Sequence, residues 1–309
     1  MHTRVSPNVS VCIATYRRNE RLRAVLEDMT RQSRLPDQVV VVDNDSAGGA
    51  RPIVEQCRAA GAPFKIDYGI EPEPNIAMTR NRTVALATGD WVAFIDDDER
   101  APPEWLGQLL YSVETFHADG VLAPVEPQVP PTAPAWIRRG RFYDFPHQAD
   151  GAPVPLSGMR FGNLLLRTSL LRAEPGPFDI RHGLMAGEDV DLLVRLARKG
   201  AKIVWFDKAC VFEPIEPKRL SLRWLVLRAV SGGQGFARYT LRGGYGPIGW
   251  PGRCLFFLRA FIQMMVASLL ALMSLPLGRH RAAAWLITAC ANLGKLSVLW
   301  GWRYRAYAR

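Results

Sequence analysis

The sequence predicts an α/β fold with a mostly parallel central sheet flanked by helices, followed by a helical C-terminal region. Over the first 125 residues, short β-branched runs alternate with stretches of helical length, which is typical of parallel strands joined by right-handed crossovers. Several runs are apolar at every position, as expected for strands covered on both faces. From residue 217 onward the composition changes, because this part holds 14 of the 39 Lys and Arg and none of the 29 Asp and Glu.

Each expected element has a local signature. Strands are expected at residues 9–16, 38–45, 64–70, 91–95, 120–125 and 201–206, and the run RFGNLLLR at residues 160–167 lies between the last two of these. Helices are expected at residues 19–31, 51–60, 76–87, 103–116 and 187–199. The last of these helices carries Val190, Leu193 and Leu196 at helical spacing and is followed by Gly200, a typical C-terminal cap.

Residues 126–158 are rich in proline and are predicted to form a long loop. Loops of this length in compact domains usually serve a function or are disordered. The aromatic residues favour a substrate-facing role, because disordered linkers seldom carry so many; they are Trp136, Phe142, Tyr143 and Phe145. Packing over the edge of the sheet is the alternative.

Three carboxylates, Asp96, Asp97 and Asp98, end the apolar strand that begins at Trp91. Clustered like charges repel and raise one another's pKa values. A divalent cation relieves that repulsion, and hard oxygen ligands suit Mg²⁺ or Mn²⁺, which often act together with substrate phosphates. A solvated acidic turn is the alternative for this motif taken alone.

Two further strands end in polar residues, at positions 15–17 (Thr-Tyr-Arg) and 43–45 (Asp-Asn-Asp). Parallel strands place their carboxyl ends on one edge of the sheet, where ligands of open α/β sheets bind. We therefore expect these residues to share one cleft with the acidic cluster.

The helix at 187–199 begins with Glu188 and Asp189, where the helix dipole stabilises carboxylates. Asp191, in the same turn, would serve that purpose alone. We therefore favour a functional role for the first two acids, and simple helix initiation is the alternative.

Composition limits the compartment and the class of protein. The five cysteines are scattered and show no metal or redox spacing, which favours reduced thiols in the cytosol. The N-terminal residues lack the features of a signal peptide, so catalysis is expected to face the cytoplasm. A dinucleotide oxidoreductase is disfavoured, because the first strand leads into TYRRNE without a glycine-rich phosphate turn.

Two apolar stretches, residues 254–277 and 282–302, approach the length that spans a bilayer. Arginines precede, separate and follow them, at Arg238, Arg242, Arg253, Arg279, Arg281, Arg303, Arg305 and Arg309. The positive-inside rule cannot place all three groups in the cytoplasm if each stretch crosses once. We therefore expect an in-plane or re-entrant hairpin on the cytoplasmic leaflet of a membrane, with the arginines on anionic headgroups. A two-span hairpin and a buried helix pair are the alternatives, and nucleic-acid binding fits poorly because long aliphatic runs separate the basic residues.

Five motifs occur in order along residues 8–213: IATYRR, VVVDNDS, PNIAMTRNRTVALATGDWVAFIDDDE, GNLLLRTSLL with GPFD, and GEDVDLLVRLARKGAKI. This ordered set resembles the family 2 glycosyltransferases with the GT-A fold. It is most similar to the bacterial exopolysaccharide branch, to which succinoglycan-type glucosyltransferases belong. The resemblance implies a GT-A catalytic domain over residues 1–217 and a membrane-associating helical region over residues 218–309.

The resemblance also implies a nucleotide pocket at the strand ends. The residues expected to line it are Thr15, Tyr16, Arg17, Asp43, Asp45, Arg80, Asp96 and Asp97. Asp43, together with Asp45, would contact the uracil or the ribose. Arg80 lies in an ARN-like element and would approach the base or the phosphates.

Catalytic roles follow from the same resemblance. Asp96 and Asp98 match the family's D-x-D pair, with Asp98 the more direct ligand of Mn²⁺ or Mg²⁺ and Asp96 nearer the ribose. Asp189 of the ED motif matches the general base, which would accept the proton of the attacking hydroxyl. Glu188 would position Asp189 or an acceptor hydroxyl. The family's reaction is a single displacement with inversion.

Two departures from the family pattern concern the C-terminal end of the match. A histidine often follows the last strand of the sheet, whereas this chain has Glu213 there. The stretch LRWLVLRAVSGGQGFAR only faintly resembles the Q-x-x-R-W element of processive synthases, so Arg223 or Arg228 would either reach the diphosphate or lie on a helix face packed on the membrane. The apolar sequence is too short for a translocation channel, so we expect addition of a single sugar.

The expected activity is transfer of a hexose from a UDP-linked sugar to a lipid-linked saccharide in cell-surface polysaccharide biosynthesis. A lipid acceptor would explain the basic, apolar tail. The alternatives are a polyprenyl-phosphate glycosyltransferase and a catalytically inactive, membrane-bound nucleotide-sugar binding protein.

Overall fold

The computed structural model of the chain describes residues 7–182 and 187–302. These residues fall into two compact units. The first lies within residues 1–126, 145–183 and 188–213, and the second within residues 127–144, 184–187 and 214–309.

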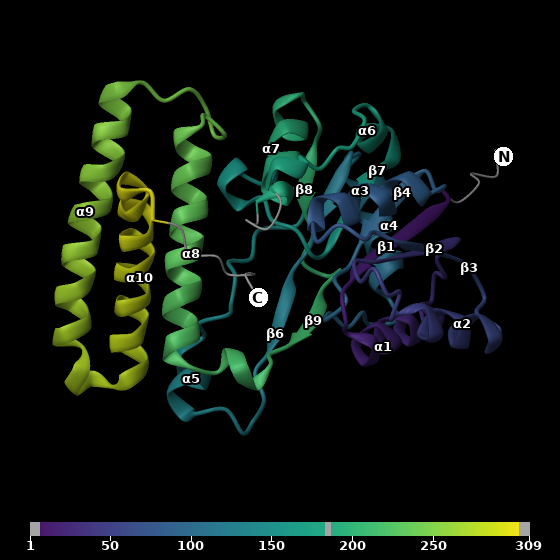
Figure 1. The fold of residues 1–309 in the computed structure, drawn as a ribbon, viewed down its shortest axis with the longest axis horizontal. Coiled ribbons are helices and arrows are strands. Elements are labelled where there is room, and N and C mark those ends of the chain that lie inside the picture. Colours follow the sequence, from purple (N-terminus) through teal and green to yellow (C-terminus); the bar gives the residue numbers. More distant parts are fainter. Residues whose placement is uncertain (1–6, 183–186, 303–309) are drawn as a thin grey trace. The chain divides into compact units, whose positions relative to one another are not determined.

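The first unit is built on a seven-stranded sheet in the order β3-β2-β1-β4-β7-β5-β8 (Figure 1). The strands are β1 (Val9–Thr15), β2 (Gln38–Asp43), β3 (Lys65–Ile70), β4 (Trp91–Phe94), β5 (Gly120–Leu122), β7 (Leu164–Arg167) and β8 (Ile203–Trp205). β7 lies within the run at residues 160–167, and each of the other strands lies inside a range expected from the sequence. Neighbouring strands are parallel except around β7, which runs antiparallel to β4 and β5. The prediction of a mostly parallel sheet is confirmed.

Helices cover both faces of this sheet, with α1 and α2 on one side and α3 on the other (Figure 1). The helices are α1 (Asn19–Thr30), α2 (Arg51–Ala59), α3 (Ile76–Leu86), α4 (Trp105–Thr115), α6 (Thr168–Arg172) and α7 (Glu188–Arg198). Alternate side chains of β1 and β2, such as Val11 and Val41, form one core with α1, α2 and α4. On the other face, the Cys12 thiol donates to the carbonyl of Thr83 in α3.

The register brings three strand ends to one edge of the sheet. Thr15 pairs with Asp43, and Cys12 pairs with Phe94. Gly89 permits the close approach of the chain before β4, since a Cβ there would lie 2.6 Å from the backbone nitrogen of Ser10. The polar residues that follow β1, β2 and β4 therefore lie along the same edge, as expected from the sequence.

The expectation of a plain loop over residues 126–158 is wrong in part. This segment contains most of β6 (Val125–Gln128), which pairs with β9 (Val211–Pro214), and the short helix α5 (Ala135–Gly140). Pro127 is tolerated because β6 belongs to a sheet of only two strands, where each strand has a free edge. Pro134 directly precedes α5, and its fixed φ suits the entry to a helix.

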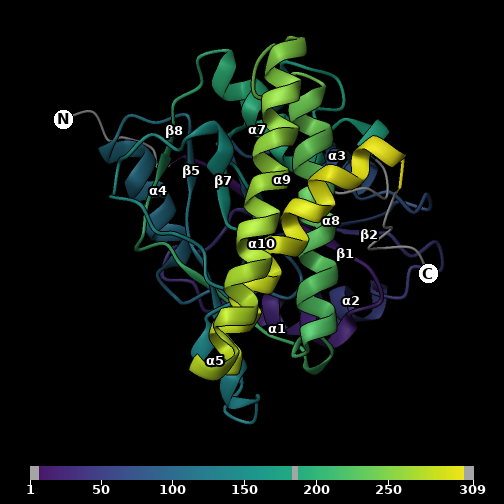
Figure 2. The ribbon, with the colours of Figure 1, turned by 90° about the vertical axis from the view of Figure 1, so that its left-hand side faces the viewer.

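The second unit contains α5 and three long helices, α8 (Leu222–Leu241), α9 (Trp250–Met273) and α10 (Arg279–Ser297). Helix α10 lies between α8 and α9 and packs on both (Figures 1 and 2). Two glycines allow the contact between α8 and α10 to be close. A Cβ at Gly233 would lie 1.9 Å from the carbonyl oxygen of Ala291, and one at Gly294 would lie 2.2 Å from that of Val230. Small residues serve the same purpose where membrane helices cross closely.

The apolar tail forms the expected helical hairpin over its described part. Helix α9 and the segment 279–300 are each long and apolar enough to cross a membrane. Only 11% of the apolar stretch in α9 is buried, compared with 39% in the second segment. Its exposed apolar side chains include Leu255, Leu258, Phe261, Ile262, Met265, Val266, Leu269 and Leu272. The expected arginine group at 303, 305 and 309 lies outside the described residues.

Candidate active site

Asp97, in the middle of the acidic cluster, joins the ends of β1 and β4. Its Oδ2 atom accepts a hydrogen bond from Thr15 Oγ1 at 2.8 Å. Its Oδ1 atom accepts one from Arg18 Nη1 at 2.7 Å. Burial raises the pKa of Asp97, while the bound Arg18 opposes this rise. The predicted convergence of the two strand ends is therefore present, and both of its members are buried.

Asp98 is bound by two arginines that the sequence reasoning did not single out. Its Oδ2 atom lies 3.1 Å from Arg18 Nη1 and 3.2 Å from Arg21 Nη1. The two arginines are three residues apart at the start of α1, which places them on one face of the helix. This spacing is the feature of the sequence that could have indicated a shared partner for them.

Asp96 faces the open side of the cluster, with 41% of its side chain exposed. Partial burial of the carboxylate removes water from it and raises the pKa of Asp96 to about 6. Arg80 opposes this rise, whereas the charges of Asp98, Asp97 and Asp189 add to it. A carboxylate held in this way is stabilised by any further positive charge.

Glu99, directly after the three aspartates in the chain, is a further member of the site that the sequence analysis did not identify. It is buried, and its Oε2 atom accepts a hydrogen bond from the backbone nitrogen of Asp96 at 3.0 Å. Burial raises the pKa of Glu99 well above its ordinary value, and the charges of Asp96, Asp98 and Glu213 add to the rise. Glu213 is thus close enough to Glu99 for its charge to affect the pKa of Glu99.

Arg80 links the cluster to helix α7. Its Nη2 atom lies 3.4 Å from Asp96 Oδ1, and its Nη1 atom lies 2.6 Å from Glu188 Oε1. The guanidinium also lies 3.8 Å from the ring centroid of Phe161 and 6.0 Å from that of Phe178. Arg80 is buried, so its described contacts hold protein groups together, and its approach to a base or phosphate stays a prediction.

Asp189 follows Glu188 in the first turn of α7. Its Oδ1 atom accepts a hydrogen bond from the backbone nitrogen of Val190 at 2.8 Å. Its charge raises the pKa of both Asp96 and Arg80, which places the ED pair and the D-x-D pair in one electrostatic site. The far side of α7 is anchored by Arg195, which binds Asp191 at 2.8 Å.

Asp43 is fully buried and binds the loop that follows it. Its two oxygens accept hydrogen bonds from the backbone nitrogens of Asp45 and Ala50, each at 2.9 Å, and from the hydroxyl of Tyr68 at 3.0 Å. Asp43 therefore orders the connection from β2 to α2. Its contact with a uracil or ribose stays a prediction.

Arg17 lies at the mouth of the same edge and has the left-handed backbone angle φ of 51°. Its Nε atom lies 2.9 Å from Asp45 Oδ2, and its guanidinium lies 5.1 Å from the ring centroid of Tyr16. The hydrogen bond from Arg17 lowers the pKa of Asp45. An ion pair between an exposed arginine and a largely buried aspartate thus connects the segments that follow β1 and β2.

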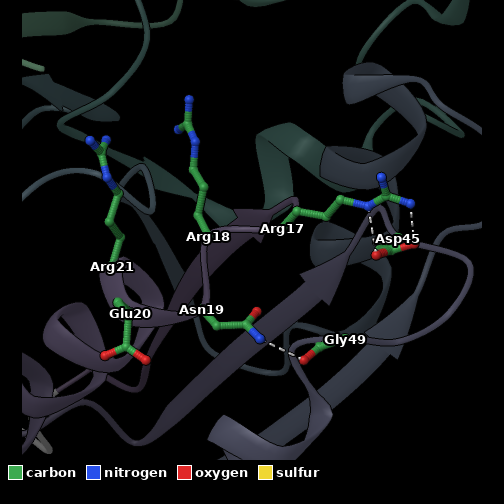
Figure 3. A pocket seen from close by; sticks show the side chains of 7 residues that line it. All are labelled: Arg17, Arg18, Asn19, Glu20, Arg21, Asp45 and Gly49. Carbon is green, nitrogen blue, oxygen red and sulfur yellow. Dashed lines mark hydrogen bonds and ion pairs between the residues drawn. The ribbon is translucent and has the colours of Figure 1, made fainter. Parts of the chain in front are cut away.

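A pocket of about 470 Å³ opens beside these residues (Figure 3). Its lining residues are Arg17, Arg18, Asn19, Glu20, Arg21, Asp45 and Gly49. Asn19 closes one side by donating from Nδ2 to the carbonyl oxygen of Gly49 at 2.9 Å. Three guanidiniums in one pocket favour an anion with planar, multidentate oxygens, such as a phosphate.

The acidic cluster fits a divalent cation whose remaining ligands come from substrate. Within residues 7–182 and 187–302, no three His, Cys, Asp or Glu side chains converge as a complete ligand set. Mg²⁺ is commonly held by one or two carboxylates together with substrate phosphates and water. Asp96 and Asp98 supply hard oxygens of this kind. The pKa of Asp96 is raised mainly by burial, and the charges of Asp98 and Asp97 add to the rise, so a cation at this position would stabilise its carboxylate.

Comparison with known proteins identifies the class. The model of the glycosyl transferase family 2 matches residues 10–173, more than half of the chain. The chain belongs to this family and is a glycosyltransferase. The succinoglycan biosynthesis protein ExoM of Rhizobium meliloti is 35% identical over 77% of this chain and 77% of its own length. The galactofuranosyltransferase GlfT1 of Mycobacterium tuberculosis is 32% identical over 63% of this chain and 66% of its own.

Solved structures support the GT-A fold. The mannosyltransferase PcManGT of Pyrobaculum calidifontis, in complex with GDP-Man and Mn²⁺, aligns with a TM-score of 0.66 and 20% identity. That alignment covers 96% of this chain and 88% of the other. TarS of S. aureus in complex with UDP aligns with a TM-score of 0.54 and 19% identity, covering 96% and 93%.

Proposed function

We propose that this chain is an inverting, metal-dependent glycosyltransferase that moves a hexose from a UDP sugar to a lipid-linked saccharide in cell-surface polysaccharide biosynthesis. The observation that carries the proposal is the bridge of Arg80 between Asp96 and Glu188, which joins the expected donor site to the ED motif. The succinoglycan relative supports the assignment to polysaccharide biosynthesis. We assign catalysis to residues 1–217.

The donor would be held at the edge of the sheet where β1, β2 and β4 end. Asp96 and Asp98 would hold Mn²⁺ or Mg²⁺, which when bound neutralises negative charge on a departing diphosphate. Asp97 and Thr15 fix the backbone of the cluster through their hydrogen bond. Arg17 and its neighbours in the pocket supply positive charge for the nucleotide.

The acceptor hydroxyl would give its proton to Asp189 as its oxygen attacks the anomeric carbon. Inversion follows because a single displacement replaces the nucleotide from the opposite face. Glu188 is held by Arg80 and keeps the first turn of α7, and hence Asp189, in a fixed position. The side chain of Asp96 is 41% exposed, so its carboxylate is accessible to the ribose of the donor.

Residues 218–309 would hold the enzyme on the cytoplasmic leaflet of the bacterial inner membrane. The exposed apolar side chains of α9 suit insertion into the acyl boundary. Arg253 and Arg259 are exposed near the start of this helix and can reach anionic headgroups. Flotation of the full chain with vesicles that contain or lack anionic lipid tests this arrangement.

The decisive test is thermal stabilisation of the detergent-purified chain by UDP and GDP, each with and without Mn²⁺. Ligand at a hundred times its dissociation constant should stabilise the fold by about 2.7 kcal/mol. We expect UDP to stabilise only with Mn²⁺, and Asp98→Ala to abolish the effect. Asp191→Asn, in which a carboxylate paired with Arg195 is replaced, serves as the control. Failure of every nucleotide, with or without metal, would contradict the donor-site assignment.

The acceptor is tested separately with purified lipids. Transfer to a lipid-linked saccharide, with no transfer to bare polyprenyl phosphate, is the expected result. Transfer to the bare lipid phosphate would instead assign the chain as a polyprenyl-phosphate glycosyltransferase. Binding of UDP without turnover on either acceptor would favour the inactive binding protein.

A further inference from the structure

We propose that Arg18 and Arg21 compete with the divalent cation for Asp98 and bind the donor's diphosphate once the cation displaces them. The cation and the nucleotide would then bind cooperatively, each raising the affinity for the other. This inference rests on the proposed function of the site and adds to it two residues that control the order in which the site is filled.

The competition follows from the geometry at one oxygen atom. Asp98 Oδ2 lies 3.1 Å from Arg18 Nη1 and 3.2 Å from Arg21 Nη1, so two cationic groups already neutralise it. A cation such as Mg²⁺ binds a carboxylate oxygen at about 2.0–2.1 Å. It would therefore lie within a few ångströms of both guanidiniums, where repulsion between positive charges is strong. The cation and the two arginines cannot share this oxygen without loss of affinity.

After displacement from Asp98, the two arginine side chains can turn into the adjacent pocket. Figure 3 shows that the side chains of Arg18 and Arg21 extend in the same direction from the start of α1, away from Asn19 and Glu20. Their side chains are 38% and 30% exposed, so a rotamer change does not disrupt the core. Both line the pocket of about 470 Å³ next to the acidic cluster.

The nature of the pocket supports a diphosphate as the second partner. Guanidinium groups bind phosphate oxygens in pairs and keep their charge at all relevant pH values. An anion that arrives with the cation would thus replace the contact with Asp98 that both arginines lose, while Arg18 can keep its contact with Asp97. By linkage, the factor by which UDP raises the affinity for Mn²⁺ equals the factor by which Mn²⁺ raises the affinity for UDP.

The experiment measures Mn²⁺ binding to the full chain in detergent by titration calorimetry, first without nucleotide and then with saturating UDP. Without UDP, we expect Arg21→Ala to bind Mn²⁺ about tenfold more tightly than the wild type, as for loss of one competing charged hydrogen bond. With Mn²⁺ present, the same variant should bind UDP more weakly, so that the coupling factor falls. Arg21→Lys, which keeps a charge, should be intermediate.

Arg23→Ala is the matched control, because Arg23 lies on the same helix and contacts Gln56 at 2.7 Å and Glu20 at 3.6 Å. It should leave both affinities unchanged. Should Arg21→Ala fail to fold, Arg18→Gln provides the same comparison.

Two outcomes overturn the proposal in different ways. If the wild type binds Mn²⁺ and UDP together but Arg21→Ala without UDP binds Mn²⁺ no more tightly, competition is wrong and the proposed function stands. If the wild type binds no Mn²⁺ even with UDP, the proposed function fails and this inference fails with it.

Discussion

Arg80 Nη1 lies 2.6 Å from Glu188 Oε1, and the two residues are separated by 108 positions in the chain. Their side chains are only 9% and 4% exposed. A buried ion pair of this kind contributes little net stability, but removal of one partner leaves a buried charge that is costly. The pair therefore couples the position of helix α7 to that of the acidic cluster.

Arg80→Met should lower the free energy of unfolding by about 3–5 kcal/mol, because Glu188 loses its buried cation. The double variant Arg80→Met/Glu188→Gln removes both charges and should recover part of this loss, which is the sign of a coupled pair. Urea unfolding of the four proteins gives the coupling energy. Strictly additive losses would show that the two residues act independently.

Asp189→Asn should lower kcat by about 10²- to 10⁴-fold, because the amide cannot accept the proton of the attacking hydroxyl. The affinity for UDP with Mn²⁺ should not change. Asp191→Asn is the control, since Asp191 lies in the same helical turn but binds Arg195. Rate measurements with saturating donor test this prediction, and an active Asp189→Asn enzyme would remove Asp189 from the role of base.

Gly233→Ala should destabilise the packing of α8 on α10 by about 1–3 kcal/mol, as for other overpacked sites. The new Cβ would meet the carbonyl oxygen of Ala291 at 1.9 Å, and a backbone atom cannot move aside as a side chain can. Gly232→Ala, one position earlier, has open space around its Cβ. We expect the control to stabilise α8 by about 0.5–1 kcal/mol. Thermal unfolding followed by circular dichroism distinguishes the two, and equal effects would disprove the close helix contact.

Glu174→Gln should weaken the anchoring of α7 in a pH-dependent way. The carboxylate of Glu174 binds Lys199 and Arg195, and these contacts lower its pKa. A lowered pKa gives stability that is present above the unfolded pKa and is lost as the pH falls through the folded pKa. We expect the variant to be less stable by up to about 1 kcal/mol at pH 7 and equal to the wild type at about pH 2. Urea unfolding at both pH values provides the measurement; a difference that persists in acid would exclude the ion pairs as its cause.

The sheet was predictable because its signals are local. Runs such as that of β2 (QVVVVD) are apolar at every inner position, and all six residues are buried. The direction of β7 was not predictable, since antiparallel pairing with β4 depends on contacts about 70 residues apart. The elements inside residues 126–158 were also missed, because proline runs hide the short strand β6 and helix α5.

The candidate site was predictable in its residues but less so in its contacts. The convergence of Thr15 with Asp97 follows from the parallel register of β1 and β4. The spacing of Arg18 and Arg21 places them on one helix face, but their ion pairs with Asp98 also depend on side-chain reach across the edge of the sheet, and that reach cannot be read from the spacing. The burial of Arg80 between Asp96 and Glu188 depends on where α7 docks, and its neighbours come from distant parts of the chain.

Helix α5 has a practical consequence for work with a shortened protein. It belongs to the same compact unit as α10 and packs on it, although the two helices are more than 130 residues apart. Its Ile137 is fully buried. A fragment of residues 1–217, made to obtain an enzyme without detergent, would keep α5 but lose α10. The apolar surface of α5 that contacts α10 would then be exposed to solvent. A polar replacement at Ile137 belongs in the design of any such soluble fragment.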